Sequence, residues 1–401
     1  MASVEDLSNY KVCELGDLVM NRMQAWSGMF AASRIEGVVS PDYSVFEVTN
    51  GNVEFFESLF RSPKLVEQFA LASKGIGTGF NRLYTPEFGA TRIPVPPIDE
   101  QDAIVRFIRH LDQRVNRLIK AKRQLIELLN EQKQAIIHHA VTQGLDPTVS
   151  LKPSGIDWLG EIPAHWNIHR IASLASSLQT GPFGSQLHSG EYVDGGVPII
   201  NPSHMTEGRI VPDPRCSVSF ERARQLERHK CAEGDVLFAR RGELGRCALV
   251  TAAQAGCLCG TGSFKMRVLN ARVASAYLVQ LLQLAGPREW LSLRSVGSTM
   301  ENLNTGILAN LPLPIPPRSE QFAILEHIGK EMALVEAVAG KTKSEIDLIR
   351  EYRTRLVSDI VTGQLDVRHL DLPDTDEPVS VIDEPDDLAD MADDDMVEAV
   401  V

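Results

Sequence analysis

Three features are scarce in this sequence: aromatic residues, paired cysteines and long apolar runs. Aromatic residues make up 6% of the 401 residues. We find no apolar run of the ~18 residues that mark a membrane-spanning helix, and no secretory signal, so the sequence predicts a cytoplasmic protein without a membrane partner. The six cysteines lack the two-pair spacing of a zinc site and are expected to be reduced thiols.

Motifs for bond chemistry are also missing. No G-x-x-x-x-G-K-[ST] loop occurs, which argues against a nucleotide-hydrolysing enzyme. NPSH at 201–204 is near to the catalytic loop of amino-methyltransferases, but it lacks the second proline and the aromatic residue that would stack on a target base. His138 and His139 have no third ligand after them and fit a helix surface better than a metal site. We therefore expect no catalytic residue, no metal and no cofactor.

The formal charge of −13 is concentrated at one end of the sequence. Residues 366–401 hold 14 acidic residues and one basic residue, which by itself gives −13, and the other 365 residues hold 39 of each sign. Within that neutral part, residues 205–275 hold twelve Lys and Arg against seven Asp and Glu. A protein can bind nucleic acid through such a local positive region whatever its total charge.

The chain contains an internal repeat, which indicates a duplication. IPVPPIDEQDAI at 93–104 returns 220 residues later as LPIPPRSEQFAI at 313–324. Three further pairs follow, the first two again 220 apart and the last 218 apart: VTQGLD at 141–146 with VTGQLD at 361–366, Gly77 and Thr85 with Gly297 and Thr305, and GDLVMNR at 16–22 with GDVLFAR at 234–240.

A long amphipathic helix is predicted in each repeat. The first has two apolar seams with a spacing of seven, broken at Lys122: Ile104, Leu111, Leu118 and Leu125, and Ile108, Val115, Leu129 and Ile136. The second has one apolar face: Ile324, Ile328, Val335, Val338, Ile346, Ile349 and Leu356. Asp99 and Ser319 stand where an N-cap is expected, and Gly144 and Gly363 near the ends. Such narrow stripes predict that the two helices pack on each other; the alternative is an oligomerisation helix.

The repeat and its motifs resemble the specificity subunit of type I restriction–modification enzymes. Further stretches that carry the resemblance are SGIDWLGEIPAHW at 154–166, GPFGS at 181–185 and GDVLFARRGELG at 234–245. The resemblance covers residues 10–366 and rests on the order, spacing and duplication of the motifs. It implies an α+β fold in which two target-recognition domains are separated by two long antiparallel coiled-coil helices, with a pseudo-two-fold internal repeat.

The resemblance also implies a function and partners. Each recognition domain reads one half of a bipartite site in double-stranded DNA. The helices set the distance between the halves and dock methyltransferase (M) subunits, which allow a restriction/motor (R) subunit to join; the specificity subunit performs no bond chemistry. Candidate docking residues on the outward helix faces are Arg106, Arg109, Arg114, Arg117, Lys120, Glu331, Glu336, Lys341 and Lys343.

Domain boundaries follow from the same comparison. We expect a partial first recognition domain at 1–95, a long helix at 96–146, a linker at 147–166 pinned by Trp158 and Trp166, a second recognition domain at 167–315, a second helix at 316–366 and an acidic disordered tail at 367–401. GDLVMNR starts at residue 16, whereas GDVLFAR starts about 68 residues after Trp166. Roughly 50 residues of the first domain are therefore expected to be missing, through truncation, a misassigned start or a split locus.

Candidates for DNA contact lie mainly in the second domain. Side chains read base edges while phosphate contacts position the protein, glycines let a backbone approach closely, and Arg suits both guanine and phosphate. Our candidates are Gln179, Gly181, Gly184, Ser185 and Gln186 in one loop, Arg240, Arg241 and Arg246 in another, Lys265 and Arg267 on one face of a strand, and Arg22 and Trp26 in the first domain. Four more basic residues fit either phosphate contacts or solvated surface: Arg222, Arg224, Arg228 and Lys230.

Other functions stay open at this point. The chain could be a structural coiled-coil adaptor without DNA binding, or an inactive truncated specificity subunit. A stand-alone nuclease is a third possibility, for which we find no supporting cluster of acidic residues and lysine.

Overall fold

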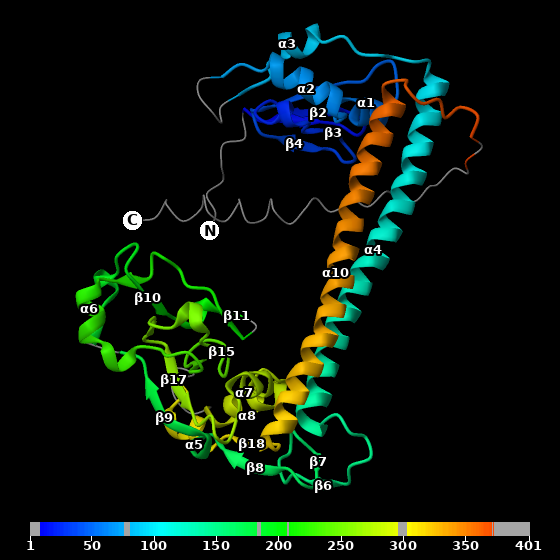
Figure 1. Ribbon diagram of the computed structural model, residues 1–401. Helices are drawn as coiled ribbons and strands as arrows, with labels where there is room; N and C mark the ends of the chain where they lie inside the picture. The colour runs from blue at the N-terminus through cyan, green and yellow to red at the C-terminus, as the bar shows by residue number, and fades with distance from the viewer. Residues whose placement is uncertain are drawn as a thin grey trace. The chain divides into compact units, whose positions relative to one another are not determined.

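The computed structural model describes residues 9–75, 81–182, 186–206, 208–295, 303–370 and Leu372, and it divides into two units (Figure 1). Unit 1 comprises Met1–Ile126 with Ala339–Val401, and unit 2 comprises Glu127–Val338. Each unit holds an α+β domain and part of two long helices, α4 (Ile98–Gln143) and α10 (Arg318–Val361). Gly77, Gly184, Ser185, Gly297 and nearly all of the acidic tail lie outside the described residues.

Unit 1 is built on a three-stranded antiparallel sheet in the order β3-β2-β5, with a separate ribbon of β1 and β4. Leu18 and Met20 of β2 are buried, whereas Val19 between them faces the other side, as the two-residue period of a strand requires. The elements are β1 (Lys11–Cys13), β2 (Leu18–Asn21), β3 (Phe30–Ala32), β4 (Gly37–Val39), β5 (Tyr43–Phe46), α1 (Val53–Phe60), α2 (Pro63–Ala72) and α3 (Thr85–Ala90).

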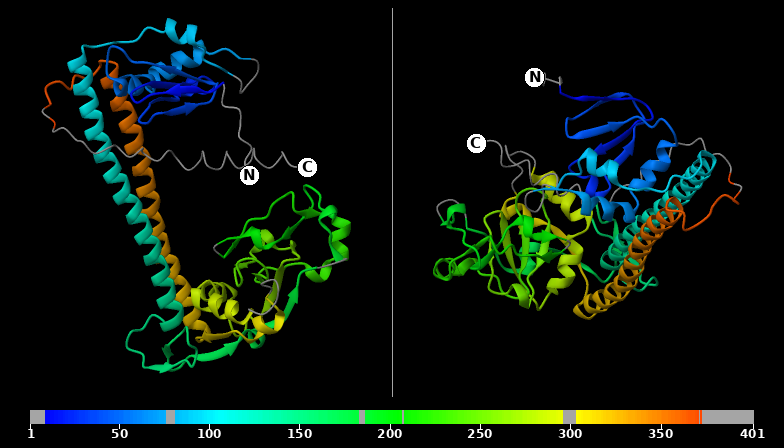
Figure 2. Two further views of the ribbon diagram at one scale, coloured as in Figure 1. Left: turned by 180° about the vertical axis from the view of Figure 1, so that it is seen from behind. Right: turned by 90° about the horizontal axis from the view of Figure 1, so that it is seen from above.

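The buried side chains of this sheet pack against α1 and α2 in one hydrophobic cluster, which Phe rings dominate. The ring of Phe30 lies 5.2 Å from the rings of Phe60 and Phe69. Leu18 and Met20 join the same cluster. One face of the sheet is thereby covered by helices (Figure 2).

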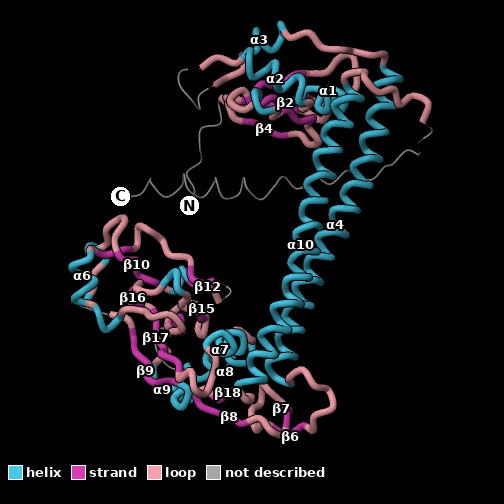
Figure 3. Tube along the Cα trace, in the orientation of Figure 1, coloured by secondary structure: helices cyan, strands magenta, loops and turns pink. Residues whose placement is uncertain are grey.

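Unit 2 contains a four-stranded antiparallel sheet in the order β15-β14-β17-β9, together with smaller sheets β13-β10-β16, β18-β8, β11-β12 and β6-β7 (Figure 3). Its strands are β6 (Leu151–Pro153), β7 (Glu161–Pro163), β8 (Asn167–Arg170), β9 (Ala175–Thr180), β10 (Val197–Ile200), β11 (Met205–Thr206), β12 (Arg209–Ile210), β13 (Ser217–Val218), β14 (Val236–Ala239), β15 (Cys247–Leu249), β16 (Leu258–Cys259), β17 (Ser263–Val268) and β18 (Pro312–Ile315). Its α-helices besides α4 and α10 are α5 (Ile171–Leu174), α6 (Phe220–Gln225), α7 (Ser275–Leu282), α8 (Ala285–Ser295) and α9 (Thr305–Asn310).

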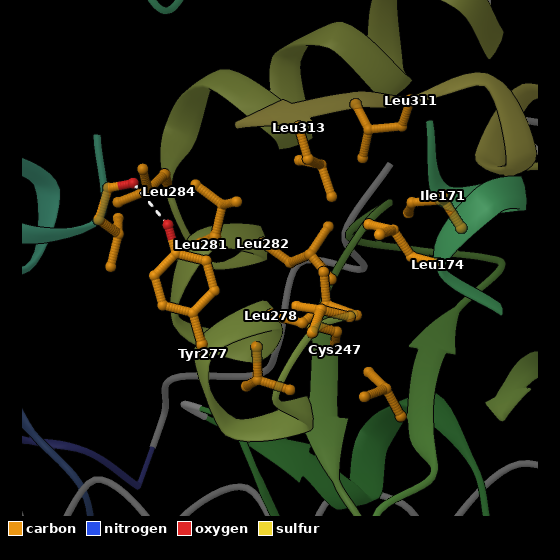
Figure 4. Close-up of a cluster of buried hydrophobic side chains, with 14 of the residues drawn as sticks. Ile171, Leu174, Cys247, Tyr277, Leu278, Leu281, Leu282, Leu284, Leu311 and Leu313 are labelled. Carbon is orange, nitrogen blue, oxygen red and sulfur yellow. Dashed lines mark hydrogen bonds between the residues drawn. The ribbon is translucent and has the colours of Figure 1, made fainter. Parts of the chain in front are cut away.

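The main core of unit 2 lies between its sheet, α7, α8 and the end of α4 (Figure 4). Tyr277 of α7 is fully buried, and its hydroxyl donates a hydrogen bond of 3.0 Å to the Val141 carbonyl at the end of α4. The linker is anchored in the same unit: Trp166 is buried and its Nε1 donates to Glu320 Oε1 at 3.0 Å. Trp158 packs on Gly286, where a Cβ atom would lie 2.3 Å from the indole. Both tryptophans therefore hold the linker, as the sequence predicted.

The repeat is visible in the hydrogen bonds of both units. Asp17 Oδ2 accepts the Glu14 amide and Asp235 Oδ2 accepts the Ala232 amide, each at 2.8 Å. The intervening glycines Gly16 and Gly234 have φ of 91° and 84°, a conformation that favours glycine. The two GD motifs thus form the same turn ahead of β2 and β14.

Both long helices begin after a Pro-Pro pair. The Pro97 and Pro317 carbonyls accept the amides of Gln101 and Gln321, so the proline precedes the first turn. The predicted N-caps were therefore wrong: Asp99 and Ser319 lie inside the first turn, because α4 begins at Ile98 and α10 at Arg318. The predicted terminal glycines are confirmed, since Gly144 and Gly363 have φ of 78° and 74° just after the helix ends.

The two long helices run antiparallel, as predicted, but the contact seam drifts from the strict spacing of seven (Figure 1). Val115, Ile119 and Ile346 form a buried cluster, whereas Leu118, Leu125 and Val338 are exposed. A helix with 3.6 residues per turn rotates gradually relative to a seven-residue repeat. Ile119 and Ile126 therefore face α10 in place of Leu118 and Leu125. Lys122, which interrupts the apolar seam, pairs with the other long helix through a contact of 2.6 Å between its Nζ and Glu345 Oε2.

No helix in the described part of the chain combines the length and the apolarity needed to cross a membrane.

Candidate nucleic-acid interface

Strand order in unit 2 brings the two predicted DNA-contact loops together. β17 runs antiparallel to both β9 and β14, with Phe264 opposite Thr180 and Ser263 opposite Ala239. The ends of β9 and β14 and the start of β17 therefore meet at the same end of the sheet, where the strands lead into loops. We call this end of the sheet the loop edge; among the described residues it comprises 181–182, Gln186, 240–246 and 260–262.

Two glycines at the loop edge are needed for chain packing. A Cβ atom on Gly181 would lie 1.8 Å from the Gly260 carbonyl oxygen, and one on Gly260 would lie 2.2 Å from Asn201 Oδ1. The Gly181 amide also donates to the Ser263 carbonyl at 2.9 Å. Gly181, predicted to let DNA approach, is instead buried against another loop of its own unit.

The three arginines after β14 have different surroundings. Arg240 Nε donates to the Leu303 carbonyl at 3.3 Å, and its guanidinium lies 5.7 Å from the Phe264 ring centre. Arg246 Nε donates to Glu243 Oε2 at 3.0 Å, and this hydrogen bond is the main cause of the lowered pKa of Glu243. Arg241 is exposed and makes no hydrogen bond or ion pair with any described residue. Arg241 is therefore available to a ligand.

Gln186 is held by two arginines that the sequence placed as phosphate contacts or solvated surface. Arg222 donates to the Gln186 carbonyl at 2.7 Å and Arg228 donates to Gln186 Oε1 at 3.0 Å. Arg222 Nε also donates to Glu191 Oε2 at 2.8 Å. Arg222 and Arg228 thus hold Gln186 in place, whereas Arg224 stays exposed.

Lys265 is a correction to the predicted DNA contacts. Its side chain is buried, and Nζ donates to the carbonyls of Arg228 at 2.8 Å and Lys230 at 2.6 Å. Arg267 shares its face of β17, as expected, but donates through Nε and Nη2 to Asp235 at 3.0 Å each. The buried ammonium of Lys265 is thus satisfied by carbonyl partners, and the exposed guanidinium of Arg267 supplies the donors that the buried Asp235 carboxylate needs.

His229 lies buried beside this network. Its Nε2 accepts a hydrogen bond of 2.9 Å from Arg228 Nε, which requires an unprotonated nitrogen. Burial, followed by the charges of Arg228 and Lys265, lowers the pKa of His229. The ring is therefore held neutral.

Gln179 completes the predicted set in unit 2. It lies exposed on β9, the edge strand of the main sheet, directly opposite Lys265. Gln179, Arg241 and Arg267 are thus the predicted polar contacts whose side chains are exposed, and of these Arg267 is paired with Asp235.

In unit 1, Arg22 is equivalent to Arg240 by the repeat. Its Nε donates to the Asp42 carbonyl at 3.0 Å and its Nη2 to the Pro41 carbonyl at 2.7 Å. Trp26 is partly exposed, with its Nε1 donating to the Met23 carbonyl at 2.8 Å. Arg22 therefore stabilises a turn of its own domain, and its predicted role as a DNA contact stays a prediction.

The sequence analysis missed two surface features of unit 2. The 201–204 stretch, considered only as a methyltransferase motif, borders the loop edge through the contact between Asn201 and Gly260, and Arg246 Nη1 lies 3.4 Å from the Pro202 carbonyl. Phe220 is 69% exposed at the start of α6, one helical turn before Arg224. Neither feature has a sequence signal, because loop contacts and solvent exposure depend on distant strands.

Metal-binding groups are sparse in the described residues. One cluster, His204, Asp213 and Cys216, brings three possible ligand atoms within 4.8 Å of one another. Asp213 there already accepts hydrogen bonds from the Arg215 amide at 2.9 Å and Nε at 3.3 Å. All six cysteines are unpaired, as the sequence predicted, and burial raises the pKa of Cys231 and Cys247 to about 12.

Several of the predicted docking residues on the helices are engaged within their own unit, and Arg117 Nε donates to the Gln113 carbonyl at 3.2 Å. Arg109 donates through Nε to Glu54 Oε2 of α1 at 2.9 Å, and Glu336 Oε1 accepts from Lys133 at 3.2 Å. His138 and His139 lie exposed on α4, which agrees with the predicted helix surface.

Curated relatives share most of the chain. It is 25% identical over 325 residues to the type I restriction enzyme MjaVIII specificity subunit of Methanocaldococcus jannaschii, covering 78% of this chain and 71% of the relative. It is 21% identical to the type I restriction enzyme EcoKI specificity subunit of Escherichia coli K12, covering 82% and 68%.

Solved structures share the fold. One, described as "Structural basis underlying complex assembly and conformational transition of the type I R-M system", superposes with a TM-score of 0.65 at 19% identity over 89% of this chain and 85% of that one. The HsdS subunit from Thermoanaerobacter tengcongensis superposes with a TM-score of 0.51 at 19% identity, over 89% and 84%. These structures support the fold expected from the resemblance: two recognition domains joined by long helices.

The family model of the type I restriction modification DNA specificity domain matches residues 27–128 and 163–344, which together make up more than half of the chain. The two matched segments fall on the two repeats. The chain therefore belongs to the family of type I restriction modification DNA specificity proteins.

Proposed function

We propose that this chain reads a bipartite site in double-stranded DNA as the non-catalytic specificity subunit of a cytoplasmic type I restriction–modification complex. The observation that carries the DNA-reading part is the loop edge of unit 2. There Arg241 is exposed and unengaged among the described residues, while the neighbouring Arg240 and Arg246 are tied down. An exposed arginine without a partner, between two arginines that are hydrogen-bonded within the domain, suits bidentate recognition of guanine.

Partners follow from the relatives. Their names describe specificity subunits of restriction enzymes, and the solved structure with the higher TM-score is described in terms of complex assembly. We infer that this chain likewise docks methyltransferase subunits and, through them, a motor-nuclease subunit. The exposed side of the helical segment is the surface that we assign to docking, and the boundaries 96–146 and 316–366 are our proposal for its extent.

The roles of the basic residues in unit 2 divide into contact and support. Arg241 and Gln179 are proposed to contact bases or phosphates, since their side chains are exposed. Lys265, Arg222 and Arg228 are proposed to hold the loops in a fixed conformation, because each donates to a loop carbonyl or amide oxygen. A preformed loop loses less conformational entropy when DNA binds.

Replacing Arg241 with Ala tests the proposal. A bidentate contact to a base contributes about 1–3 kcal/mol, so the affinity of the assembled methyltransferase complex for its site should fall roughly 5- to 150-fold. The loss should be confined to one half-site, as scored by base substitutions in each half. Fluorescence anisotropy with the reconstituted complex provides the measurement.

Arg294→Ala is the matched control, because Arg294 is an exposed arginine of the same unit that stacks on Trp290 of α8. It should leave DNA affinity unchanged. Loss of methyltransferase assembly in Arg241→Ala would show that Arg241 has another role. If the unaltered complex bound DNA without regard to sequence, a structural coiled-coil adaptor would replace the proposed function.

A further inference from the structure

Three residues of unit 2 with metal-binding side chains lie close together beside β10. One ligand atom each of His204, Asp213 and Cys216 lies within 4.8 Å of the other two. With bonds of ~2.0–2.3 Å in a tetrahedral site, ligand atoms are roughly 3.3–3.8 Å apart, so small side-chain shifts would let all three hold one ion. The expected absence of a metal rested on cysteine spacing along the chain, which cannot reveal a set with a single cysteine.

Backbone hydrogen bonds fix the places of these three residues. The His204 carbonyl accepts the Val211 amide at 2.9 Å, beside the paired strands β11 and β12. The Asp213 carbonyl accepts the Cys216 amide at 3.0 Å, and the Cys216 carbonyl accepts the Ile199 amide of β10 at 2.8 Å. The fold of unit 2 therefore positions the three side chains without a metal.

The His204 ring has one nitrogen engaged and one free. The side chain is buried, and Nδ1 lies 3.1 Å from the Ile199 carbonyl oxygen and 3.3 Å from the Asn201 amide nitrogen. A ring that donates to the carbonyl carries its proton on Nδ1 and keeps a free lone pair on Nε2, which has no hydrogen-bond partner among the described residues. A backbone carbonyl that holds the other ring nitrogen is the usual support of a metal-binding histidine.

Asp213 and Cys216 complete a set of ligands that suits Zn²⁺. Cys216 is the one cysteine of the six that is not buried, so an ion from solvent can reach its sulfur. Asp213 is held by Arg215, but the side chain of Arg215 is 85% exposed and can turn into solvent. Imidazole, thiolate and carboxylate together favour Zn²⁺ over Mg²⁺ and Ca²⁺, which take oxygen ligands.

We propose that His204, Asp213 and Cys216 bind one Zn²⁺ ion, with water at the fourth position of the tetrahedron. The ion would link the two segments that carry these residues. The first segment packs on Gly260 of the loop edge through Asn201, so the ion would stabilise one side of the loop edge. Such a site acts through the fold and requires no bond chemistry.

A cobalt titration of the reduced full chain tests the site. Co²⁺ occupies Zn²⁺ sites, and its bond to a thiolate gives a charge-transfer absorption in the near ultraviolet. We expect this absorption to rise until one equivalent of Co²⁺ is bound and to disappear when Zn²⁺ is added, because such sites bind Zn²⁺ more tightly than Co²⁺. Absence of the absorption in excess Co²⁺ would overturn the proposal.

Substitutions identify the ligands. Cys216→Ser should abolish the charge-transfer absorption, and His204→Gln should weaken Zn²⁺ binding roughly 100-fold, because losing even a residue that supports a ligand costs about 10- to 100-fold. Cys13→Ser and His138→Gln, at positions outside the cluster, should change neither measurement. Hydrogen exchange in β14 and β17 checks that each variant is folded. An absorption that survives Cys216→Ser would assign the metal to another thiol and overturn the site.

Arg215→Ala gives a prediction of the opposite sign. The exposed Arg215 side chain can be removed without loss of packing, and its removal frees the Asp213 carboxylate. Zn²⁺ binding should therefore tighten by up to about fivefold. Arg224→Ala, at an exposed arginine of the same unit, is the control and should leave Zn²⁺ affinity unchanged.

Weaker Zn²⁺ binding in Arg215→Ala would overturn the assignment of Asp213 as a ligand. None of these measurements uses DNA, so their outcome is independent of the proposed function.

Discussion

The two recognition domains share one face of their sheets and differ on the other. On the shared face, helices α1 and α2 or α7 and α8 cover alternate residues of β2 or β14. On the other face, unit 2 has a second buried cluster, whereas the equivalent side chains of unit 1 are partly or fully exposed. The motifs that reveal the repeat therefore belong to the helix-covered face of each sheet and to the starts of the long helices. The two domains diverge on the other face of the sheet.

One buried glutamine explains the EQ motif of both repeats. Gln321 Nε2 donates to the carbonyls of Pro316 at 2.9 Å and Arg272 at 3.1 Å, and its Oε1 accepts the Ala274 amide at 2.7 Å. Gln101 Nε2 donates to the Pro96 carbonyl at 2.8 Å and its Oε1 accepts the Asn52 amide at 2.8 Å. The side chain thus ties the start of each long helix to the recognition domain.

The largest expected difference between the units comes from removing this side chain. Gln321→Ala leaves three backbone groups without this partner, two of them in buried hydrogen bonds, and should destabilise unit 2 by ~3 kcal/mol. Gln101→Ala leaves two less buried groups and should cost unit 1 about 2 kcal/mol or less. Hydrogen exchange resolved by unit provides the measurement, since the chain need not unfold in two states.

Gln124→Ala, at an exposed position of α4, is the control and should change stability by less than ~0.5 kcal/mol. Equal losses for Gln101→Ala and Gln321→Ala would mean that the extra bond and deeper burial in unit 2 contribute nothing.

A smaller difference concerns the first turn of α7. The Gln101 and Gln321 contacts match Asn52 with Ala274, so Tyr277, three residues further on, is equivalent to Phe55, and Tyr277→Phe gives unit 2 the side chain of unit 1. The Val141 carbonyl then loses the hydrogen bond from the Tyr277 hydroxyl, which should cost unit 2 about 1 kcal/mol. Denaturant unfolding followed by exchange in α7 checks this value.

Tyr352→Phe, at an exposed position of α10, should be silent. If Tyr277→Phe is silent as well, the buried hydroxyl is not a stabilising link between α7 and α4.

The smallest expected effect is a dependence on pH confined to unit 2. The pKa of His229 is lowered in the folded state, so the unfolded chain binds its proton more readily. Stability from this residue is therefore present above the ordinary pKa of about 6.5 and decreases as the pH falls below it. Charged groups facing the ring are Arg228 and Lys265.

His229→Gln should flatten the fall in unit 2 stability between pH 7 and 5.5, measured by unit-resolved exchange. His138→Gln, on the exposed surface of α4, is the matched control and should leave the pH profile unchanged. An unaltered profile in His229→Gln would assign the dependence to other groups.

Local patterns allowed part of the site and fold to be predicted. The Pro-Pro pairs, terminal glycines and apolar stripes located both helices, because these signals act over a few residues. The same apolar stripes wrongly predicted that Leu118 and Leu125 lie in the contact between the two helices. Which residues form that contact depends on whether the helices are straight or supercoiled. The arginine-rich stretch forms a loop after β14, but its sequence could not distinguish Arg241 from Arg246, whose partner Glu243 is set by the fold of the turn.

By itself the sequence determined the duplication, the two long helices and the family, since these depend on order and spacing along the chain. Tertiary structure alone decided that Lys265 is buried and Arg241 exposed. It also decided that Val38 is exposed whereas Leu258, the equivalent residue of the second repeat, is buried. These outcomes depend on pairings such as Lys265 with the Arg228 carbonyl, 37 residues away. Burial is a property of what lies across the sheet, and no local pattern records it.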